Sequence, residues 1–180
     1  MRKEPVLQDV QNTSKQITPF VHRTPVLTSQ SVNSIIDGEV FFKCENFQKT
    51  GSFKMRGASN AVLSLSEEES KRGVVTVSSG NHGAALACAA KLNGMKSHVV
   101  TPKNTQQVKI DAMKGYGANL VYCEPSVESR ESTLLKVQQE TGSVLIHPYN
   151  DYRVISGAGT VAIELINEIK DLDFIVVPIG

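Results

Sequence analysis

The sequence is poor in the residues on which several common kinds of site and scaffold depend. It has no tryptophan, 6% aromatic residues and only three cysteines among 180 residues. Cys44, Cys88 and Cys123 form no Cys-x-x-Cys pair and lie among apolar neighbours, which favours small buried side chains over a disulfide or a metal site. The four histidines also lack the spacing of helical metal ligands. We therefore expect no metal-ligating residues in this chain.

An excess of one charge and long apolar runs are also lacking. Nineteen Lys and Arg residues nearly balance eighteen Asp and Glu residues, so neither a nucleic-acid partner nor a membrane surface is expected. The longest apolar runs, such as 174–179, are far too short to cross a bilayer. The first residues are polar rather than the apolar core of a secretory signal. A cytoplasmic enzyme or binding domain is the expectation.

From Gly73 onward the sequence alternates between strand-like and helix-like segments. The expected strands are Val74–Val77, Ser97–Val100, Asn119–Tyr122, Val144–Ile146 and Phe174–Val177. The expected helices between them are Ala84–Leu92, Thr105–Lys114, Ser126–Thr141 and Val154–Ile169. Nearly continuous apolar strands that alternate with helices predict an α/β fold, an open parallel sheet with helices on both faces.

The pattern before Gly73 is less regular. It predicts helices at Leu7–Ile17, Ser29–Ile35 and Phe53–Leu65, with one strand at Val40–Glu45. The charged residues at 67–69 and 71–72 indicate a solvated connector. We accordingly divide the chain into residues 1–72, a small α/β domain at 73–150, and residues 151–180 that return to the first domain.

One segment, Lys49 to Ala58, combines small residues with a lysine. In Lys-Thr-Gly-Ser-Phe-Lys-Met-Arg-Gly-Ala, the Thr-Gly-Ser run can line a phosphate with hydroxyl and N–H groups. The amine of Lys54 can bond covalently to a carbonyl compound. In isolation, such a segment is more often a basic helix start with a solvated lysine.

A second segment, Ser78-Ser-Gly-Asn-His-Gly83, lies between an expected buried strand and a helix. Backbone N–H groups at the start of a helix attract an anion, and a substrate carboxylate has a suitable size. The alternative is an ordinary helix cap supplied by Ser79 or Asn81, with His82 as a packed or capping side chain.

The two segments together resemble the fold-type II (tryptophan synthase β-like) pyridoxal-phosphate enzymes, and among these the serine racemases and serine/threonine dehydratases. The resemblance extends over nearly the whole chain, through Phe42-Lys-Cys-Glu, Tyr116-Gly-Ala, His147-Pro and Gly157-x-Gly-Thr. It implies pyridoxal 5'-phosphate as cofactor and a small amino acid, L-serine or L-threonine, as substrate. It also implies a homodimer.

The resemblance assigns roles to individual residues. Lys54 matches the lysine that holds the cofactor and removes the substrate proton, Phe53 the aromatic beside the ring, and Asn81 the amide bonded to the ring hydroxyl. Ser79 matches the catalytic serine on the opposite face of the cofactor. The residues implied around the substrate are Ser78, Ser79, Asn81, His82 and Arg130. For Arg130 the alternative is a solvated helix residue.

These roles favour one reaction over another. Racemisation needs a second acid on the opposite face of the substrate, whereas β-elimination needs only one face. In branched-chain threonine dehydratases the position of Ser79 is usually alanine, so a serine favours a serine racemase that also has dehydratase activity. An ammonia-lyase without racemisation and a truncated, non-catalytic product stay open as alternatives.

The resemblance also implies Mg²⁺ and ATP as activators of the full-length protein. The matching nucleotide contacts are Ser29, Lys49, Thr50 and Tyr116.

The resemblance is incomplete in two respects. Ala84 and Ala158 replace glutamines of the racemase pattern, and Tyr149 replaces an asparagine near the cofactor. The glycine-rich phosphate loop and the metal ligands would follow Gly180, so a fragment ending within the large domain is expected.

Overall fold

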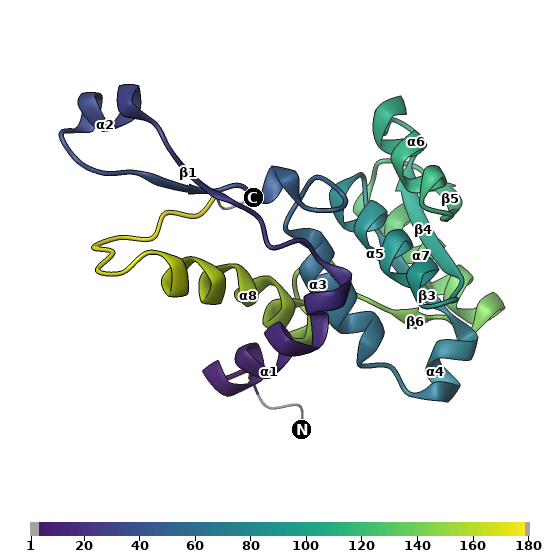
Figure 1. Ribbon diagram of the computed structural model, residues 1–180. Helices are drawn as coiled ribbons and strands as arrows, with labels where there is room; N and C mark the ends of the chain where they lie inside the picture. The colour runs from purple at the N-terminus through teal and green to yellow at the C-terminus, as the bar shows by residue number, and fades with distance from the viewer. Residues whose placement is uncertain (1–3, 179–180) are drawn as a thin grey trace.

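The computed structural model describes residues 4–178, and its centre is a parallel four-stranded sheet (Figure 1). The strand order is β5-β4-β3-β6, and all three neighbouring pairs are parallel. The strands are β3 (Val74–Val77), β4 (Ser97–Pro102), β5 (Asn119–Cys123) and β6 (Val144–Leu145). The expected parallel sheet is confirmed.

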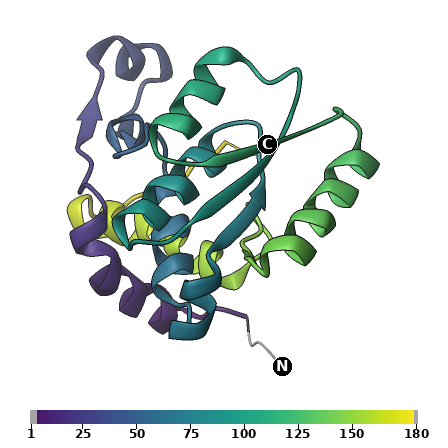
Figure 2. The same ribbon diagram turned by 90° about the vertical axis from the view of Figure 1, so that its right-hand side faces the viewer.

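Helices cover both faces of this sheet. Helices α5 (Asn81–Leu92) and α6 (Gln107–Gly115) pack on one face, and α7 (Val127–Thr141) packs on the other (Figure 2). Val99 contacts the α5 and α6 side, where it packs with Ala84 and Met113. Its neighbour Val100 belongs to the cluster with Val137 of α7. Alternation along a strand therefore provides both apolar faces.

The remaining long helices pack beside this unit. They are α1 (Leu7–Ile17), α3 (Lys54–Leu63) and α8 (Tyr152–Glu168), and α3 contacts both α8 and α5. The backbones of α3 and α8 touch, because a Cβ added to Gly157 would lie 2.5 Å from the carbonyl oxygen of Arg56. The division at residues 72 and 150 stays a prediction.

A smaller antiparallel pair projects at one end of the molecule (Figure 1). It consists of β1 (Val26–Thr28) and β2 (Phe41–Lys43), with α2 (Gln30–Ile36) between them in sequence. Two short 3₁₀ helices, η1 (Thr18–Phe20) and η2 (Glu45–Phe47), complete this region. The first strand was not predicted, since a run of three residues pairs only through tertiary contact.

Two predictions about the elements are wrong. Residues 174–177 form no strand, and their large side chains are at least half exposed, because no neighbouring strand is present within residues 4–178. The charged segment is not a connector but a helix, α4 (Glu67–Arg72). It begins with a capping box in which Ser66 and Glu69 bond each other's backbone N–H groups.

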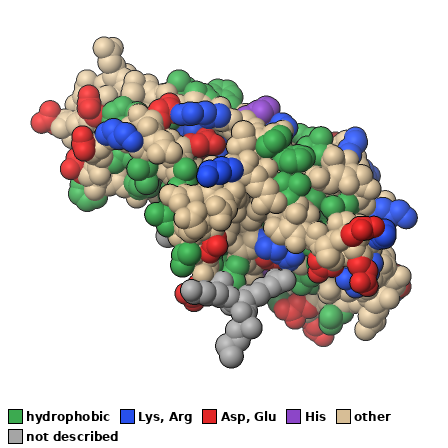
Figure 3. Space-filling view, turned by 60° about the horizontal axis from the view of Figure 1, so that its bottom comes forward, with side chains coloured by type: hydrophobic (Ala, Val, Ile, Leu, Met, Phe, Trp, Pro, Cys, Tyr) green, Lys and Arg blue, Asp and Glu red, His purple; other side chains and the backbone are tan. Residues whose placement is uncertain are grey.

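The surface carries both charges. Acidic and basic side chains are interspersed on the face shown in Figure 3. Among residues 4–178, no helix combines the length and apolar character needed to span a membrane.

All three cysteines are free; Cys88 and Cys123 are buried as expected, whereas Cys44 is half-buried.

Candidate active site

Four loops follow the carboxyl ends of the four parallel strands. In an open parallel sheet these ends lie along one edge, where ligands commonly bind. The loop after β3 and the start of α5 carry 78–83, the loop after β5 leads to Arg130, and the segment after β6 carries 147–150. Residues far apart in the sequence, among them five of the candidate site residues singled out above, thus follow strand ends at one edge.

Lys54 reaches this edge from a different element, as the first residue of α3. Its Nζ donates a hydrogen bond of 2.9 Å to the carbonyl oxygen of Pro148, in the segment after β6. The Nζ also lies 5.1 Å from the centre of the Phe53 ring. Burial lowers the pKa of the Lys54 amine, which favours the neutral, nucleophilic form. The basic helix start is thus not fully solvated.

The N-cap of α5 is Gly80, and the side chain that bonds N–H groups at the start of the helix belongs to Ser78 rather than to Ser79 or Asn81. Its Oγ accepts hydrogen bonds from the N–H of Gly80 (3.1 Å) and of Gly83 (2.9 Å). The cap alternative named the wrong residue, since only the Ser78 side chain turns back toward these amides. Both bonds use Ser78 as an acceptor, so its own O–H is left to donate. Ser79 is exposed, and its hydroxyl forms no hydrogen bond within residues 4–178.

His82 is buried, with 4% of its surface exposed. Burial lowers its pKa to about 4, and the nearby charges of Lys54 and His147 act in the same direction. Its Nε2 lies 3.3 Å from the carbonyl oxygen of Ile146, so this nitrogen donates. In the neutral ring Nδ1 is then an acceptor, and it has no partner within residues 4–178. A packed histidine accounts for the burial of the ring but not for a buried Nδ1 acceptor without a hydrogen-bond partner within residues 4–178.

Asn81 is exposed at the first position of α5, and its Oδ1 accepts a 2.9 Å hydrogen bond from Nζ of Lys109. The sequence reasoning missed Lys109. It lies within the expected helix 105–114, but no motif or spacing connects it with Asn81.

Arg130 lies in the first turn of α7 and is half-buried. Its Nε is buried and has no partner within residues 4–178. A merely solvated side chain does not explain a buried guanidinium nitrogen that lacks an acceptor. The side chain lies near Cys123, whose thiol pKa the positive charge pulls down while burial raises it more strongly.

The structure brings together three of the four residues expected to contact a nucleotide. The Tyr116 hydroxyl donates to the carbonyl oxygen of Lys49 at 3.2 Å, and the neighbouring Thr50 has a buried hydroxyl with no partner in the described part of the chain. Ser29 instead caps α2, where its Oγ accepts from Val32 N–H. Figure 1 places α2 at the opposite end of the molecule from α6.

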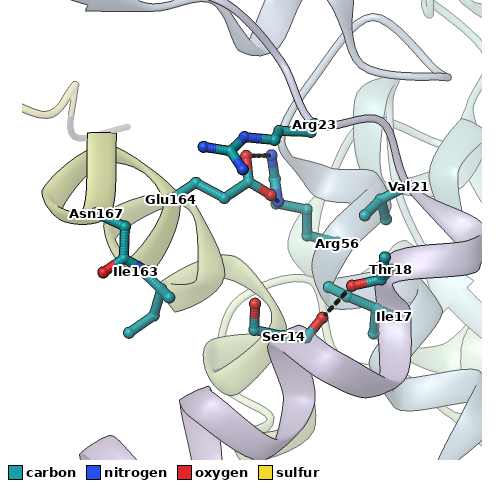
Figure 4. A pocket seen from close by; sticks show the side chains of 9 residues that line it. All are labelled: Ser14, Ile17, Thr18, Val21, Arg23, Arg56, Ile163, Glu164 and Asn167. Carbon is teal, nitrogen blue, oxygen red and sulfur yellow. Dashed lines mark hydrogen bonds and ion pairs between the residues drawn. The ribbon is translucent and has the colours of Figure 1, made fainter. Parts of the chain in front are cut away.

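Two cavities lie outside the loop that carries Ser79. One of about 230 Å³ lies between α1 and α8 (Figure 4), and all three guanidinium nitrogens of its Arg56 already donate to protein acceptors. It therefore offers a ligand no buried free donor from that arginine. The second, about 450 Å³, adjoins the segment after β6 and is lined by Leu145, His147, Asn150, Asp151, Tyr152 and Arg153.

The chain is similar to known proteins over nearly its whole length. Serine racemase from Arabidopsis thaliana is 54% identical over 171 residues, which cover 95% of this chain and 52% of that protein. A beta-hydroxyaspartate dehydratase from Paracoccus denitrificans is 47% identical over 98% of this chain and 56% of its own length. The structure of maize serine racemase superposes with a TM-score of 0.93 at 46% identity, covering 95% of this chain and 52% of the maize chain.

The chain spans about half the length of the curated relatives it matches. Residues 17–180 match the family described as pyridoxal-phosphate dependent enzyme. The matched region includes both motifs and every strand of the parallel sheet. The chain belongs to the family of pyridoxal-phosphate dependent enzymes.

Proposed function

We propose that this chain carries the lysine-bearing half of a serine racemase that also eliminates water from L-serine and L-threonine. One observation carries the proposal: a half-buried Lys54 amine with a lowered pKa lies against the Pro148 carbonyl, at the edge where several polar groups lack partners within residues 4–178. Such a set of unpaired donors and acceptors is typical of a site completed by a ligand.

The residues present fit the reactive end of pyridoxal phosphate. An amine with a depressed pKa, an aromatic ring beside it and a side-chain amide whose Nδ2 has no hydrogen bond within residues 4–178 would hold the cofactor through Lys54, Phe53 and Asn81. When bound, the cofactor withdraws electrons from the amino acid, so that the proton on its Cα becomes acidic. The Lys54 amine, once free, accepts that proton as a general base.

The polar groups assigned to the candidate site divide into donors and acceptors. The free O–H of Ser78 and the buried Nε of Arg130 are donors, which suit a substrate carboxylate. The vacant Nδ1 of neutral His82 is an acceptor and would repel a carboxylate. We therefore assign His82 to the substrate hydroxyl rather than to the carboxylate. Ser79, exposed and without an intramolecular partner, supplies the proton on the other face.

An ammonia-lyase without racemisation is the second candidate. It is favoured by the 47% identity to a protein named a dehydratase. The distinction depends on Ser79, since elimination needs no proton donor on the second face.

Nucleotide activation is part of the proposal, with Lys49, Thr50 and Tyr116 as contacts and Ser29 as a more remote one. Residues 4–178 contain no group of three His, Cys, Asp or Glu side chains that could hold a metal ion, so Mg²⁺ has no such cluster here.

We also propose a cytoplasmic homodimer, to which Leu27 and Phe42 contribute apolar area. They face each other across β1 and β2 and are 49% and 43% exposed.

The decisive experiment is covalent trapping. Pyridoxal phosphate is added to the purified chain, borohydride is added, and the modified peptide is identified by mass spectrometry. We expect the adduct on Lys54, its loss in Lys54→Ala, and its retention in Lys49→Ala as the matched control. No adduct, or an equal adduct in Lys54→Ala, would refute the proposal and favour a non-catalytic product.

A further inference from the structure

Lys109 contacts the site from α6, a helix to which the sequence assigned no role. Its Nζ lies 2.9 Å from Oδ1 of Asn81, 28 residues away in the chain. The stem of Lys109 also covers Gly80, since a Cβ added to that glycine would lie 3.4 Å from the lysine Cδ. Packing against the loop therefore restricts where the ammonium group can be.

The chemistry of the ammonium group determines how the Asn81 amide is turned. An ammonium has three donors and no acceptor, so only the oxygen of the amide can face it. The amide nitrogen must then point away from Lys109. Among the hydrogen bonds within residues 4–178, none involves the Asn81 Nδ2, which leaves two donors free at the start of α5.

We propose that Lys109 is a positioning residue, which holds the Asn81 amide in the orientation that presents Nδ2 to the cofactor. This inference rests on the proposed function, in which Asn81 bonds the ring hydroxyl of pyridoxal phosphate. Without the ammonium group the amide is free to flip and to present Oδ1. An amide oxygen would repel an ionised ring oxygen, whereas Nδ2 donates to it.

Three variants test the role. Lys109→Met keeps most of the stem and removes the ammonium, and Lys109→Arg keeps a cationic donor. Lys114→Met removes the same charge from an exposed position at the other end of α6 and serves as the control. The affinity for pyridoxal phosphate is measured from the fraction of chain trapped by borohydride as the cofactor concentration rises.

We expect Lys109→Met to weaken cofactor affinity roughly tenfold, the effect of one hydrogen bond to a charged group. Lys109→Arg should recover most of this loss, and Lys114→Met should change affinity by less than about twofold. In an Asn81→Ala background, Lys109→Met should have almost no further effect, because the residue acts through Asn81. The side-chain amide signal of Asn81 in the cofactor-free chain should shift in Lys109→Met and not in Lys114→Met.

Two results would overturn the inference while the proposed function stands. One is an equal loss of affinity in Lys109→Met and Lys114→Met, which would indicate general attraction of the phosphate. The other is an undiminished effect of Lys109→Met in the Asn81→Ala background, which would indicate direct contact with the cofactor. Failure of the wild-type chain to form the Lys54 adduct would instead refute the proposed function, and this inference with it.

Discussion

Two polar regions lie on either side of helix α3, and they differ in how completely their groups are paired. On the side toward α8, the guanidinium of Arg56 is fully buried, yet every one of its nitrogens donates. Its carboxylate partners are Glu45 and Glu164, at distances between 2.6 and 3.0 Å. At the carboxyl edge of the sheet, by contrast, polar groups are buried without partners among residues 4–178.

The Arg56 side is a neutral network. Lys43 Nζ lies 2.7 Å from Glu164, so two cations balance two carboxylates. Burial alone lowers the pKa of Arg56, but hydrogen bonds and attraction from the two carboxylates outweigh this and raise it. The same contacts with Arg56 and Lys43 lower the pKa of Glu164 although burial raises it. Within residues 4–178, every nitrogen of Arg56 and both carboxylate oxygens of Glu45 and of Glu164 have a hydrogen-bond partner.

At the edge beside Lys54, buried polar groups lack hydrogen-bond partners within residues 4–178. Among residues 4–178, four of the six buried side-chain atoms that lack a partner belong to residues assigned to the site or its lysine motif. They are Thr50 Oγ1, Ser52 Oγ, His82 Nδ1 and Arg130 Nε. The contrast teaches that burial of polar groups by itself does not mark a site, since Arg56 is fully paired, whereas most of the buried side-chain atoms without a partner within residues 4–178 belong to the candidate site or its lysine motif.

The largest expected effect comes from breaking the paired region. Arg56→Met leaves two buried carboxylates opposed by one lysine and should lower the free energy of unfolding by about 3–5 kcal/mol. Urea denaturation measures it. Arg23→Met is the matched control, because Arg23 also pairs with a glutamate of α8 but is 70% exposed. Arg23→Met should lower the free energy of unfolding by no more than about 1 kcal/mol. Equal losses in the two variants would contradict the distinction between the buried, fully paired arginine and the exposed one.

Removing the proposed second-face group should alter chemistry and leave the fold intact. In the full-length protein, Ser79→Ala should lower racemisation of L-serine by about 10²–10⁴-fold, the usual contribution of a general acid or base, while most of the elimination is retained. Formation of D-serine and of pyruvate is measured on the same samples. A parallel fall of both products would argue against the two-face assignment.

The lowered pKa of His82 should make the free energy of unfolding depend on pH. Between pH 6.5 and about 4 the unfolded chain binds a proton at this histidine that the folded chain does not. Stability therefore falls as the pH falls through this window, by up to about 3 kcal/mol. His82→Gln keeps a donor for the Ile146 carbonyl and does not titrate. Unfolding in urea at several pH values should show a shallower fall for the variant, and identical slopes would exclude this origin.

The smallest effect on the free energy of unfolding is expected at Lys54, the most important residue of the proposed function. Lys54 donates to a single backbone carbonyl and is half-buried, so Lys54→Ala should change the free energy of unfolding by about 1 kcal/mol or less. The same variant loses the trapped adduct. A stability loss as large as that of Arg56→Met would place Lys54 in the supporting structure instead.

The parallel sheet could be predicted because its signals are local. Strand β3 and helix α1 have the predicted bounds, since continuous apolar runs and helical periodicity are properties of neighbouring residues. Helix α4 was missed although Ser66 and Glu69 carry the Ser-x-x-Glu capping signal. The strand at 174–177 was predicted from the same apolar pattern as β3, but a strand also needs a neighbour with which to pair.

The candidate site was predicted in part. The lysine and serine motifs are contiguous in sequence, so their resemblance to a family is readable without a structure. The bond from Lys54 to Pro148 and that from Lys109 to Asn81 join residues 94 and 28 positions apart. Such partners follow no periodicity, and only the folded chain identifies them.

The sequence by itself therefore determined the α/β class, the family and the residue types offered to a cofactor. The tertiary structure decided which of those residues are already paired and which are open to a ligand. Arg56, two residues from Lys54 in the same motif, is fully paired within the protein, whereas Lys54 meets one carbonyl at the edge of the sheet. The physical reason is that residues two apart on a helix point in different directions, so their surroundings depend on what packs against each face.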